Sequence, residues 1–337
     1  MRERHFISRI AELTGLRHPG GPIGHPSFLQ GIGDDCAILS GPLLGDRLIT
    51  TDMLVEGVHF DCRWHPASLL GRKALAVNVS DIAAMGGRAE FALLSVALPS
   101  RLDDAWIVAF LEGFAGKLAE ERMILIGGDT VGGDELIIAV TVLGSVSPGQ
   151  AIKRQGARPG DGVYVTGALG LAAAALHLCQ KQGFTLNDMA TSPWPHLLKA
   201  LLDPQAQSAM GRLLAGLGGV SAMLDISDGL ATDLAHICQA SQVAAEIFAD
   251  RLAPHPDVEN YCRLVGLDPI DLQLRGGEDY QLLFTMPPER EEALSLACAS
   301  EDLPAPRRIG LIREGEGVWL VQEGAATEIT FQGYEHR

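Results

Sequence analysis

Basic residues are scarce in this sequence, and no apolar stretch is long enough to cross a membrane. The 337 residues include 26 Lys and Arg against 42 Asp and Glu, a formal net charge of −16. Nucleic acids and anionic membranes require clustered Lys and Arg, which are absent here, so we expect neither as a partner. No uncharged apolar run approaches the roughly 18–20 residues of a transmembrane helix. Met1–Arg17 lacks the apolar core of a signal peptide, so the expected location is the cytoplasm.

Paired cysteines are also missing. The six cysteines are scattered along the chain, and none forms a C-x-x-C pair with another. Without a secretion signal, this pattern indicates reduced and mostly buried thiols and argues against a disulfide framework or a zinc site.

The usual nucleotide-binding motifs are absent too. The chain has no GxxxxGK[ST] segment, which excludes a P-loop protein, and no HRD or DFG set of a protein kinase. Val163–Gly170 (VYVTGALG) resembles the first turn of a dinucleotide fold but lacks the full G-x-G-x-x-G. We interpret it as a strand–helix turn with small residues for packing.

Length and hydrophobic patterning predict two domains, residues 1–148 and 149–337, divided at a Ser-Pro-Gly turn. In the first domain, helical spacing predicts a helix over Pro66–Met85 that ends at two glycines. Residues 17–33, rich in Gly, Pro and His, are predicted to form a loop. Irregular alternation of strands and helices favours an α+β first domain with a mixed sheet. Strands are expected at Arg47–Asp52, Glu90–Leu98, Met123–Ile126, Leu136–Val146, Gly162–Thr166, Val220–Ile226, Tyr280–Thr285, Arg308–Ile312 and Gly317–Val321, with helices following Asp103 and over Leu169–Gln180, Pro204–Leu217 and Leu230–Ala240.

The most informative feature is a junction that recurs five times, where an apolar strand leads into acidic residues beside glycine or a hydroxyl residue. A single Asp-Gly or Gly-Asp pair is usually only a turn. Several together suggest a binding site, because ligands of α/β sheets bind at strand ends. A further carboxylate, Asp81, lies two turns along the predicted helix from Lys73. The junctions are GIGDDCA (Gly31–Ala37), TTDML (Thr50–Leu54), IGGDTVGGD (Ile126–Asp134), LDISDGL (Leu224–Leu230) and RGGEDY (Arg275–Tyr280).

Carboxylates that converge on one site repel each other unless a cation lies between them. Mg²⁺ binds carboxylates, hydroxyls, water and substrate phosphates, and neighbouring glycines let backbone amides approach a phosphate. The residues therefore predict nucleotide-phosphate chemistry on several metal ions. A calcium site is the alternative, although no EF-hand spacing supports it.

These motifs, in this order, resemble the thiamine-monophosphate kinases, a family within the aminoimidazole ribonucleotide synthetase superfamily. The resemblance spans about Phe6 to His336 and rests on the segments GIGDDCA, TTDMLVEGVHF, KALAVNVSDIAAMG, LIGGDT, KRQGARPGD, LDISDGLATDL, GGEDYQLLF and FQGYEHR. It implies ATP-dependent phosphorylation of thiamine monophosphate to thiamine diphosphate with Mg²⁺. It also implies an N-terminal mixed-sheet domain that forms a homodimer, and a C-terminal α/β domain that completes the active site.

The resemblance implies a role for each residue of a set. Metal ligands would be Asp35, Thr50, Thr51, Asp52, Asp81, Asp129, Asp225 and Asp228; ATP would contact Gly128, Asp129, Arg154 and Ser227; and the thiamine phosphate would contact His59, Glu278 and Phe331. An arginine offers phosphate a fork of donors, and an aromatic ring can stack on a heterocycle. Phe331 stands where the family more often has Trp.

No general base is assigned, because the nucleophile is a phosphate oxygen that is already ionised near neutral pH. Two alternatives stay open: another ATP-dependent enzyme of the superfamily, such as a selenophosphate or aminoimidazole ribonucleotide synthetase, and a non-catalytic nucleotide-binding protein. For individual residues, Asp34 is either a ligand or a neighbour of one, and Lys73 either neutralises phosphate or pairs with a carboxylate. Asp134 and Asp279 are interpreted as turn or cap residues.

Overall fold

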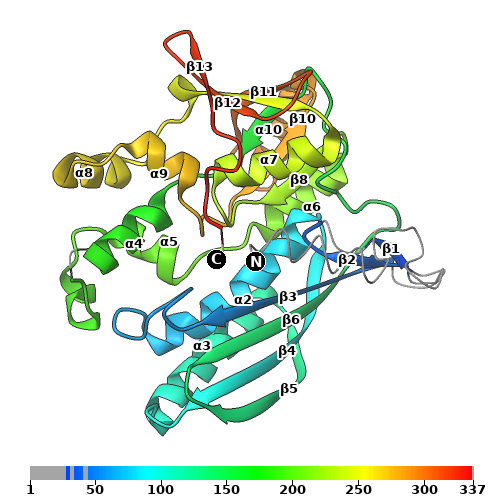
Figure 1. The fold of residues 1–337 in the computed structure, drawn as a ribbon. Helices are drawn as coiled ribbons and strands as arrows, with labels where there is room; N and C mark the ends of the chain where they lie inside the picture. The colour runs from blue at the N-terminus through cyan, green and yellow to red at the C-terminus, as the bar shows by residue number, and fades with distance from the viewer. Residues whose placement is uncertain (1–27, 31–33, 41–44, 182, 336–337) are drawn as a thin grey trace.

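The structure is a computed structural model that describes residues 28–30, 34–40, 45–181 and 183–335. Gly31–Gly33 of the first junction, most of the predicted loop over residues 17–33, and the last two residues lie outside this described part. Within it the chain forms two sheets, each with its own helices, and Figure 1 shows them one above the other.

The first sheet has six strands in the order β1-β2-β3-β6-β4-β5. The pair β4–β5 is parallel and the other pairs are antiparallel, so the predicted mixed sheet is confirmed. The strands are β1 (Phe28–Gln30), β2 (Ala37–Leu39), β3 (Asp46–Val55), β4 (Arg88–Pro99), β5 (Ile124–Gly133) and β6 (Ile137–Val146).

Helices α2 (Ala67–Ala84) and α3 (Asp104–Glu121) cover one face of this sheet (Figure 1). Alternate residues of β3 and β6, such as Leu48 and Val140, point into the core against them. The predicted helix signals are confirmed at two ends. The Asp103 side chain accepts a hydrogen bond from the Trp106 amide at 2.8 Å, and the chain leaves α2 through Gly86 at φ +73°.

The second sheet has seven strands in the order β13-β12-β9-β11-β7-β10-β8, and only β9–β12 is a parallel pair. Its strands are β7 (Gly162–Val165), β8 (Ala222–Asp225), β9 (Ala244–Phe248), β10 (Leu282–Met286), β11 (Arg307–Arg313), β12 (Val318–Gln322) and β13 (Ala325–Glu328). The helices are α4 (Leu171–Lys181), α5 (Pro195–Leu202), α6 (Ser208–Leu217), α7 (Leu230–Ser241), α8 (Pro256–Val265), α9 (Pro269–Arg275) and α10 (Glu291–Ser300), with 3₁₀ turns η1 (Leu186–Thr191), η2 (Ala249–Arg251) and η3 (Pro288–Arg290).

Several boundaries differ from the sequence predictions. Strand β5 does not end at Ile126 but continues through the two glycines and Asp129, because pairing with β4 supplies its hydrogen bonds as far as Gly133. Strand β1 lies inside the predicted loop, where it pairs with β2. The helix predicted over Pro204–Leu217 begins only at Ser208. Helices α5, α8, α9 and α10 and strand β9 were not predicted, since each is short and local periodicity is weak over such lengths.

The cysteines follow the prediction. All six are free thiols; five are buried and Cys62 is partly exposed. None of the helices in the described part of the chain combines the length and apolar character that a bilayer crossing requires.

Two glycines allow α2 and α3 to touch through their backbones. A Cβ atom on Gly113 would lie 1.8 Å from the carbonyl oxygen of Ser68, and one on Gly71 would lie 2.1 Å from that of Phe110. No side chain fits at such distances, so the crossing depends on glycine. This contact fixes α2, the helix that carries Lys73 and Asp81.

We expect Gly113→Ala to destabilise the protein by about 1–3 kcal/mol, because the added methyl group forces the helices apart. The matched control is Gly116→Ala on the same helix, where a Cβ would meet nothing closer than an Arg72 nitrogen at 4.0 Å. There alanine should be neutral or stabilising, since it is the better helix former. Thermal unfolding of both variants tests this, and equal midpoints would contradict it.

Candidate active site

Three aspartates from separate elements meet between the two sheets. Asp35 precedes β2, Asp81 lies on α2 and Asp225 ends β8, and one carboxylate oxygen from each lies within 4.8 Å of the other two. The Asp35 side chain is only 1% exposed, and Asp225 is buried. Three acids so close together in a desolvated position repel each other strongly.

Hydroxyl and guanidinium groups surround this carboxylate cluster. Thr50 and Ser80 donate hydrogen bonds of 2.5 Å to Asp81 and Asp225, respectively. The Arg154 Nη2 group lies 2.6 Å from Oδ1 of Asp35. Arg154 thus brings one positive charge to the cluster, which offsets at most part of the negative charge of the three carboxylates.

Burial, and after it the neighbouring carboxylates, raise the pKa values of these acids. Burial, followed by repulsion from Asp35, raises the pKa of Asp225 to about 7 and that of Asp52 to about 6. Burial and then the charges of Asp52 and Asp225 raise the pKa of Asp81 well above its usual range. Asp34, which accepts a hydrogen bond from the Arg154 amide, has its pKa raised to about 7 by burial and by Asp35.

The loop after β8 is organised by an acid that the sequence analysis missed. One oxygen of Asp233, in the first turn of α7, accepts hydrogen bonds from the amides of Ser227, Asp228 and Gly229 at 3.0–3.1 Å. A sequence signal existed, because an acidic residue early in a helix often caps the preceding loop. Asp233 thus fixes the loop that presents Asp228 and Ser227.

A second loop, the GGEDY segment, faces α2. The carboxylate of Glu278 in this loop forms an ion pair with Lys73, with Oε1 2.9 Å from Nζ. Asp279 accepts a hydrogen bond from the Gly170 amide at 2.8 Å, just before α4 begins, so of the turn and cap roles considered for it the cap fits. Of the two roles considered for Lys73, this geometry supports the pairing with a carboxylate.

A cavity of about 390 Å³ opens beside α2 and is lined by His59, Lys73 and the rings of Phe60, Trp64 and Phe184, among others. Nδ1 of His59 accepts a hydrogen bond from the Val55 amide at 3.0 Å. In the neutral ring the proton is therefore on Nε2, which makes that nitrogen a donor.

Phe331 is not among the residues that line this cavity. Its ring meets that of His236 edge-on, with centroids 5.3 Å apart, and packs against the second core. Of the three residues expected to contact the thiamine phosphate, His59 thus lines the cavity and Glu278 pairs with Lys73 of its lining, whereas Phe331 packs elsewhere on the second domain.

Comparisons with known proteins agree with this architecture. Residues 33–146 match the family model described as AIR synthase related protein, N-terminal domain, and residues 158–321 match its C-terminal counterpart. The chain is 37% identical to a thiamine-monophosphate kinase of Escherichia coli over 91% of both chains, and 37% identical to one of Bacillus subtilis over 93% of this chain and 95% of the other. The chain belongs to the thiamine-monophosphate kinase family.

A solved structure described as AaThiL complexed with AMPPCP and TMP is similar over the whole chain. It is 32% identical, has a TM-score of 0.81, and is matched over 100% of this chain and 97% of that one. The two-domain fold expected from the resemblance to the thiamine-monophosphate kinase family is thereby confirmed.

Two of the metal ligands expected for a thiamine-monophosphate kinase do not point towards the carboxylate cluster. In the strand register Asp129 lies beside Ser95, Ser95 beside Ala139, and Ala139 beside Met53. Residues paired in this way share a face. Met53, 56% exposed, belongs to the face away from α2, whereas Thr50 reaches Asp81 on the α2 side.

Thr51 alternates with Thr50 and so lies on the outer face as well, where it accepts a hydrogen bond from Thr141 at 3.0 Å. Asp129 is three strands away from β3, about 14 Å at the usual strand spacing. Within one chain, Thr51 and Asp129 therefore cannot bind the same ion.

The residues of the carboxylate cluster fit a divalent cation. Oδ2 of Asp35 and Nε of Arg154 are buried, and neither has a hydrogen-bond partner among the described residues. A carboxylate oxygen without a partner, beside two further carboxylates, is a suitable ligand for a hard cation such as Mg²⁺. The unpartnered Arg154 donor is suited to an anion at the same place.

The raised pKa values predict how stability responds to pH. Because the folded pKa values of about 6–7 exceed the ordinary 3.8, these groups contribute stability below pH ~4, and that contribution is lost as the pH rises towards 7. A bound cation should offset this loss. We therefore expect Mg²⁺ to raise the thermal midpoint more at pH 8 than at pH 5, relative to KCl of equal ionic strength. An equal Mg²⁺ effect at both pH values would contradict the prediction.

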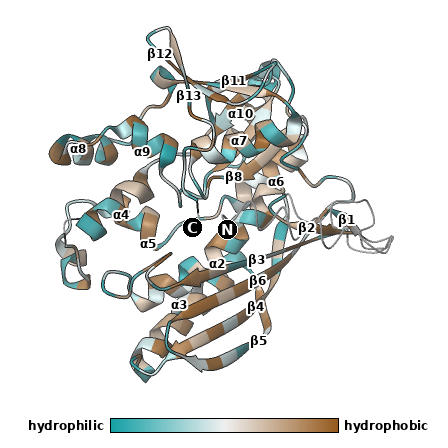
Figure 2. Cartoon of the chain, in the orientation of Figure 1, coloured by the Kyte–Doolittle hydropathy of each residue, from teal (hydrophilic) through white to brown (hydrophobic). Residues whose placement is uncertain are grey.

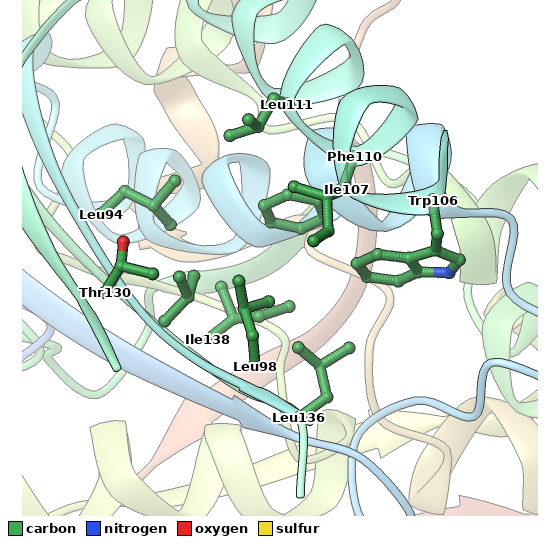
Figure 3. Close-up of a pocket in the computed structure, with 10 residues that line it drawn as sticks. Leu94, Leu98, Trp106, Ile107, Phe110, Leu111, Thr130, Leu136 and Ile138 are labelled. Carbon is green, nitrogen blue, oxygen red and sulfur yellow. The ribbon is translucent and has the colours of Figure 1, made fainter. Parts of the chain in front are cut away.

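A second cavity, of about 260 Å³, lies between α3 and the first sheet (Figure 3). Trp106, Phe110 and their neighbours on α3 face Leu94 and Ile138 from the strands, and Thr130 supplies the one polar side chain in the lining. None of the expected site residues lines it.

Proposed function

We propose that this protein transfers the γ-phosphoryl group of ATP to thiamine monophosphate and so forms thiamine diphosphate. The observation that carries the proposal is the similarity, over the whole chain, to the structure described as complexed with AMPPCP and TMP. AMPPCP is an ATP analogue that resists cleavage, so the acceptor and the donor of this reaction were both represented in that complex. The carboxylate cluster adds a site suited to phosphate-bound metal.

Mg²⁺ ions would be held by Asp35, Asp52, Asp81 and Asp225, and the remaining expected ligands Thr50, Thr51, Asp129 and Asp228 stay part of the proposal. Bound Mg²⁺ would neutralise phosphate charge. The chain's own residues supply the rest. Arg154, already anchored on Asp35, has a spare donor for a phosphate oxygen, while Gly128, Asp129 and Ser227 are the other proposed contacts of ATP.

The acceptor would be held by His59, Glu278 and Phe331. Nε2 of His59 donates towards an acceptor atom of the substrate, and Glu278 offers a carboxylate to its cationic thiazolium ring. The nucleophile is a phosphate oxygen, so no side chain has to remove a proton, and catalysis consists of in-line positioning and charge neutralisation.

The proposal includes a homodimer formed through the first sheet. The edge strand β5 exposes Ile124 and Ile126, at 60% and 54%, and β3, three strands away in the same sheet, exposes Met53. Figure 2 colours much of β4, β5 and β6 as hydrophobic. An apolar edge and face of this kind support association with a second copy. The division at residues 148 and 149 and the cytoplasmic location also belong to the proposal.

A turnover assay tests the function. Purified protein is incubated with ATP, Mg²⁺ and thiamine monophosphate, and thiamine diphosphate is followed by chromatography, with unphosphorylated thiamine as the control acceptor. We expect product from the monophosphate alone. Binding of ATP with Mg²⁺ but no product would contradict the proposed acceptor and favour another enzyme of the superfamily.

A further inference from the structure

Lys73 is a fully buried lysine in a helix of the first domain. Its side chain is 0% exposed, and its Nζ lies 2.9 Å from Oε1 of Glu278, a residue 205 positions away on the other domain. A buried ammonium group needs a close anionic partner, since desolvation without one is very costly. The proposed mechanism assigns no task to Lys73 itself.

The backbone around Glu278 is held firmly by the strand-end loop next to it. Glu278 has φ +64° and donates its amide to the Ser227 carbonyl at 2.8 Å; Tyr280 has φ +48° and donates to the Ile226 carbonyl at 2.8 Å. Residues other than glycine seldom adopt such angles, and they tend to do so at functional sites. The loop thus fixes the Glu278 backbone, and Lys73 fixes the direction of its carboxylate.

Lys73 also lines the 390 Å³ cavity, together with His59 and several aromatic rings. Two other charged residues of the lining, Asp61 and Arg63, pair with each other at 2.6 Å. The neighbouring His65 stays neutral, because burial and then the Lys73 charge lower its pKa to about 3. The Glu278 carboxylate, 22% exposed, is therefore the group that offsets the Lys73 charge, although Glu278 is not itself among the residues that line the cavity.

We propose that Lys73 is a positioning residue for the acceptor, which holds the Glu278 carboxylate where it meets the cationic ring of thiamine monophosphate. This inference rests on the proposed function and adds a residue to it. A carboxylate beside a cationic ring attracts it, whereas an unpaired lysine at the same wall would repel it. The pair therefore has to act as a unit: Lys73 orients Glu278, and Glu278 neutralises Lys73.

Steady-state kinetics of three variants test this role. Lys73→Met keeps the length of the side chain and should raise the KM for thiamine monophosphate about tenfold, with the KM for ATP changed less than about twofold. Glu278→Gln should raise the same KM further, about a hundredfold, because it leaves the lysine charge unpaired beside the acceptor. The double variant should bind the acceptor better than Glu278→Gln alone, since that charge is then removed.

Lys117→Met is the matched control. Lys117 is likewise buried, 1% exposed, but it lies on α3 and pairs with Glu120 and Glu121 at 2.7 and 3.1 Å. Its loss should lower the thermal midpoint and leave both KM values unchanged. If Lys73→Met gives this same result, Lys73 has only a structural role and the inference is overturned.

Failure of the proposed function gives a different result. A wild-type protein that makes no thiamine diphosphate overturns the function, and with it the role of Lys73. A wild type that turns over, with a KM unchanged in Lys73→Met, overturns the role alone. If Lys73→Met does not fold, the double variant of Lys73→Met and Glu278→Gln is compared with Glu278→Gln. A KM for thiamine monophosphate that is no lower in the double variant contradicts the proposed coupling of Lys73 to Glu278.

Discussion

Asp81→Asn is expected to reduce turnover about a thousandfold while it raises the thermal midpoint of the metal-free protein. Turnover falls because the variant removes one of three converging carboxylates that would hold the metal, and charge neutralisation is the main catalytic contribution proposed. Stability rises because the pKa of Asp81 is raised by burial and by Asp52 and Asp225, so the ionised side chain destabilises the fold. The amide still accepts the hydrogen bond from Thr50.

The direction of the change in thermal midpoint distinguishes a metal ligand from a buried acid that only supports the fold. Asp233 is also buried, and its pKa is raised by burial and then by Asp228 and Asp225, but it accepts three backbone hydrogen bonds. Asp233→Asn should lower the midpoint, because an amide oxygen accepts these bonds more weakly than a carboxylate. Calorimetry with and without Mg²⁺ makes the comparison. A lower midpoint in metal-free Asp81→Asn would show that Asp81 stabilises the fold rather than binding metal.

Much of the first domain could be predicted from its sequence. Helices α2 and α3 and strands β3, β4 and β6 are long, and the helix ends carry recognisable signals such as Asp103 and Gly86. Strand β5 could not be predicted in full. Glycine and aspartate are turn residues by local preference, and only pairing with β4 keeps Gly128 and Asp129 extended. The short elements of the second domain are likewise stabilised by packing more than by their own sequence.

The candidate site was only partly predictable for a similar reason. Strand-end acids such as Asp35 and Asp225 could be found because they follow apolar segments, and the structure brings them together with Asp81. Which face of a strand a residue occupies depends on register, which the sequence does not display directly. Thr50 and Thr51 are neighbours in sequence, yet they point to opposite faces. The supporting contacts of Lys73 and Ser80 join residues that only the folded chain brings together, whereas those of Asp233 are local.

Mixing two inactive variants is expected to restore activity. Asp129 lies on the outer face of the first sheet and three strands from Thr51, so one chain cannot place both on one ion. In the proposed homodimer the outer faces of two copies would come together, and Asp129 of one copy would then face Thr51 of the other, on the strand whose Thr50 reaches Asp81. We expect Asp81→Asn and Asp129→Ala each to be nearly inactive alone. Dissociated and reassembled together, they should regain about a quarter of wild-type activity.

The expected fraction follows from counting sites. Random pairing makes about half of the dimers mixed, and in each mixed dimer one of the two sites receives an intact Asp81 from one chain and an intact Asp129 from the other. If Asp129 instead acted within its own chain, every site would carry one substitution, and mixing would restore nothing. An Asp129→Ala variant that is fully active alone would remove this residue from the site altogether. The control mixes Asp81→Asn with Asp225→Asn. Each chain forms its own carboxylate cluster from both residues, so every site stays damaged and no recovery is expected.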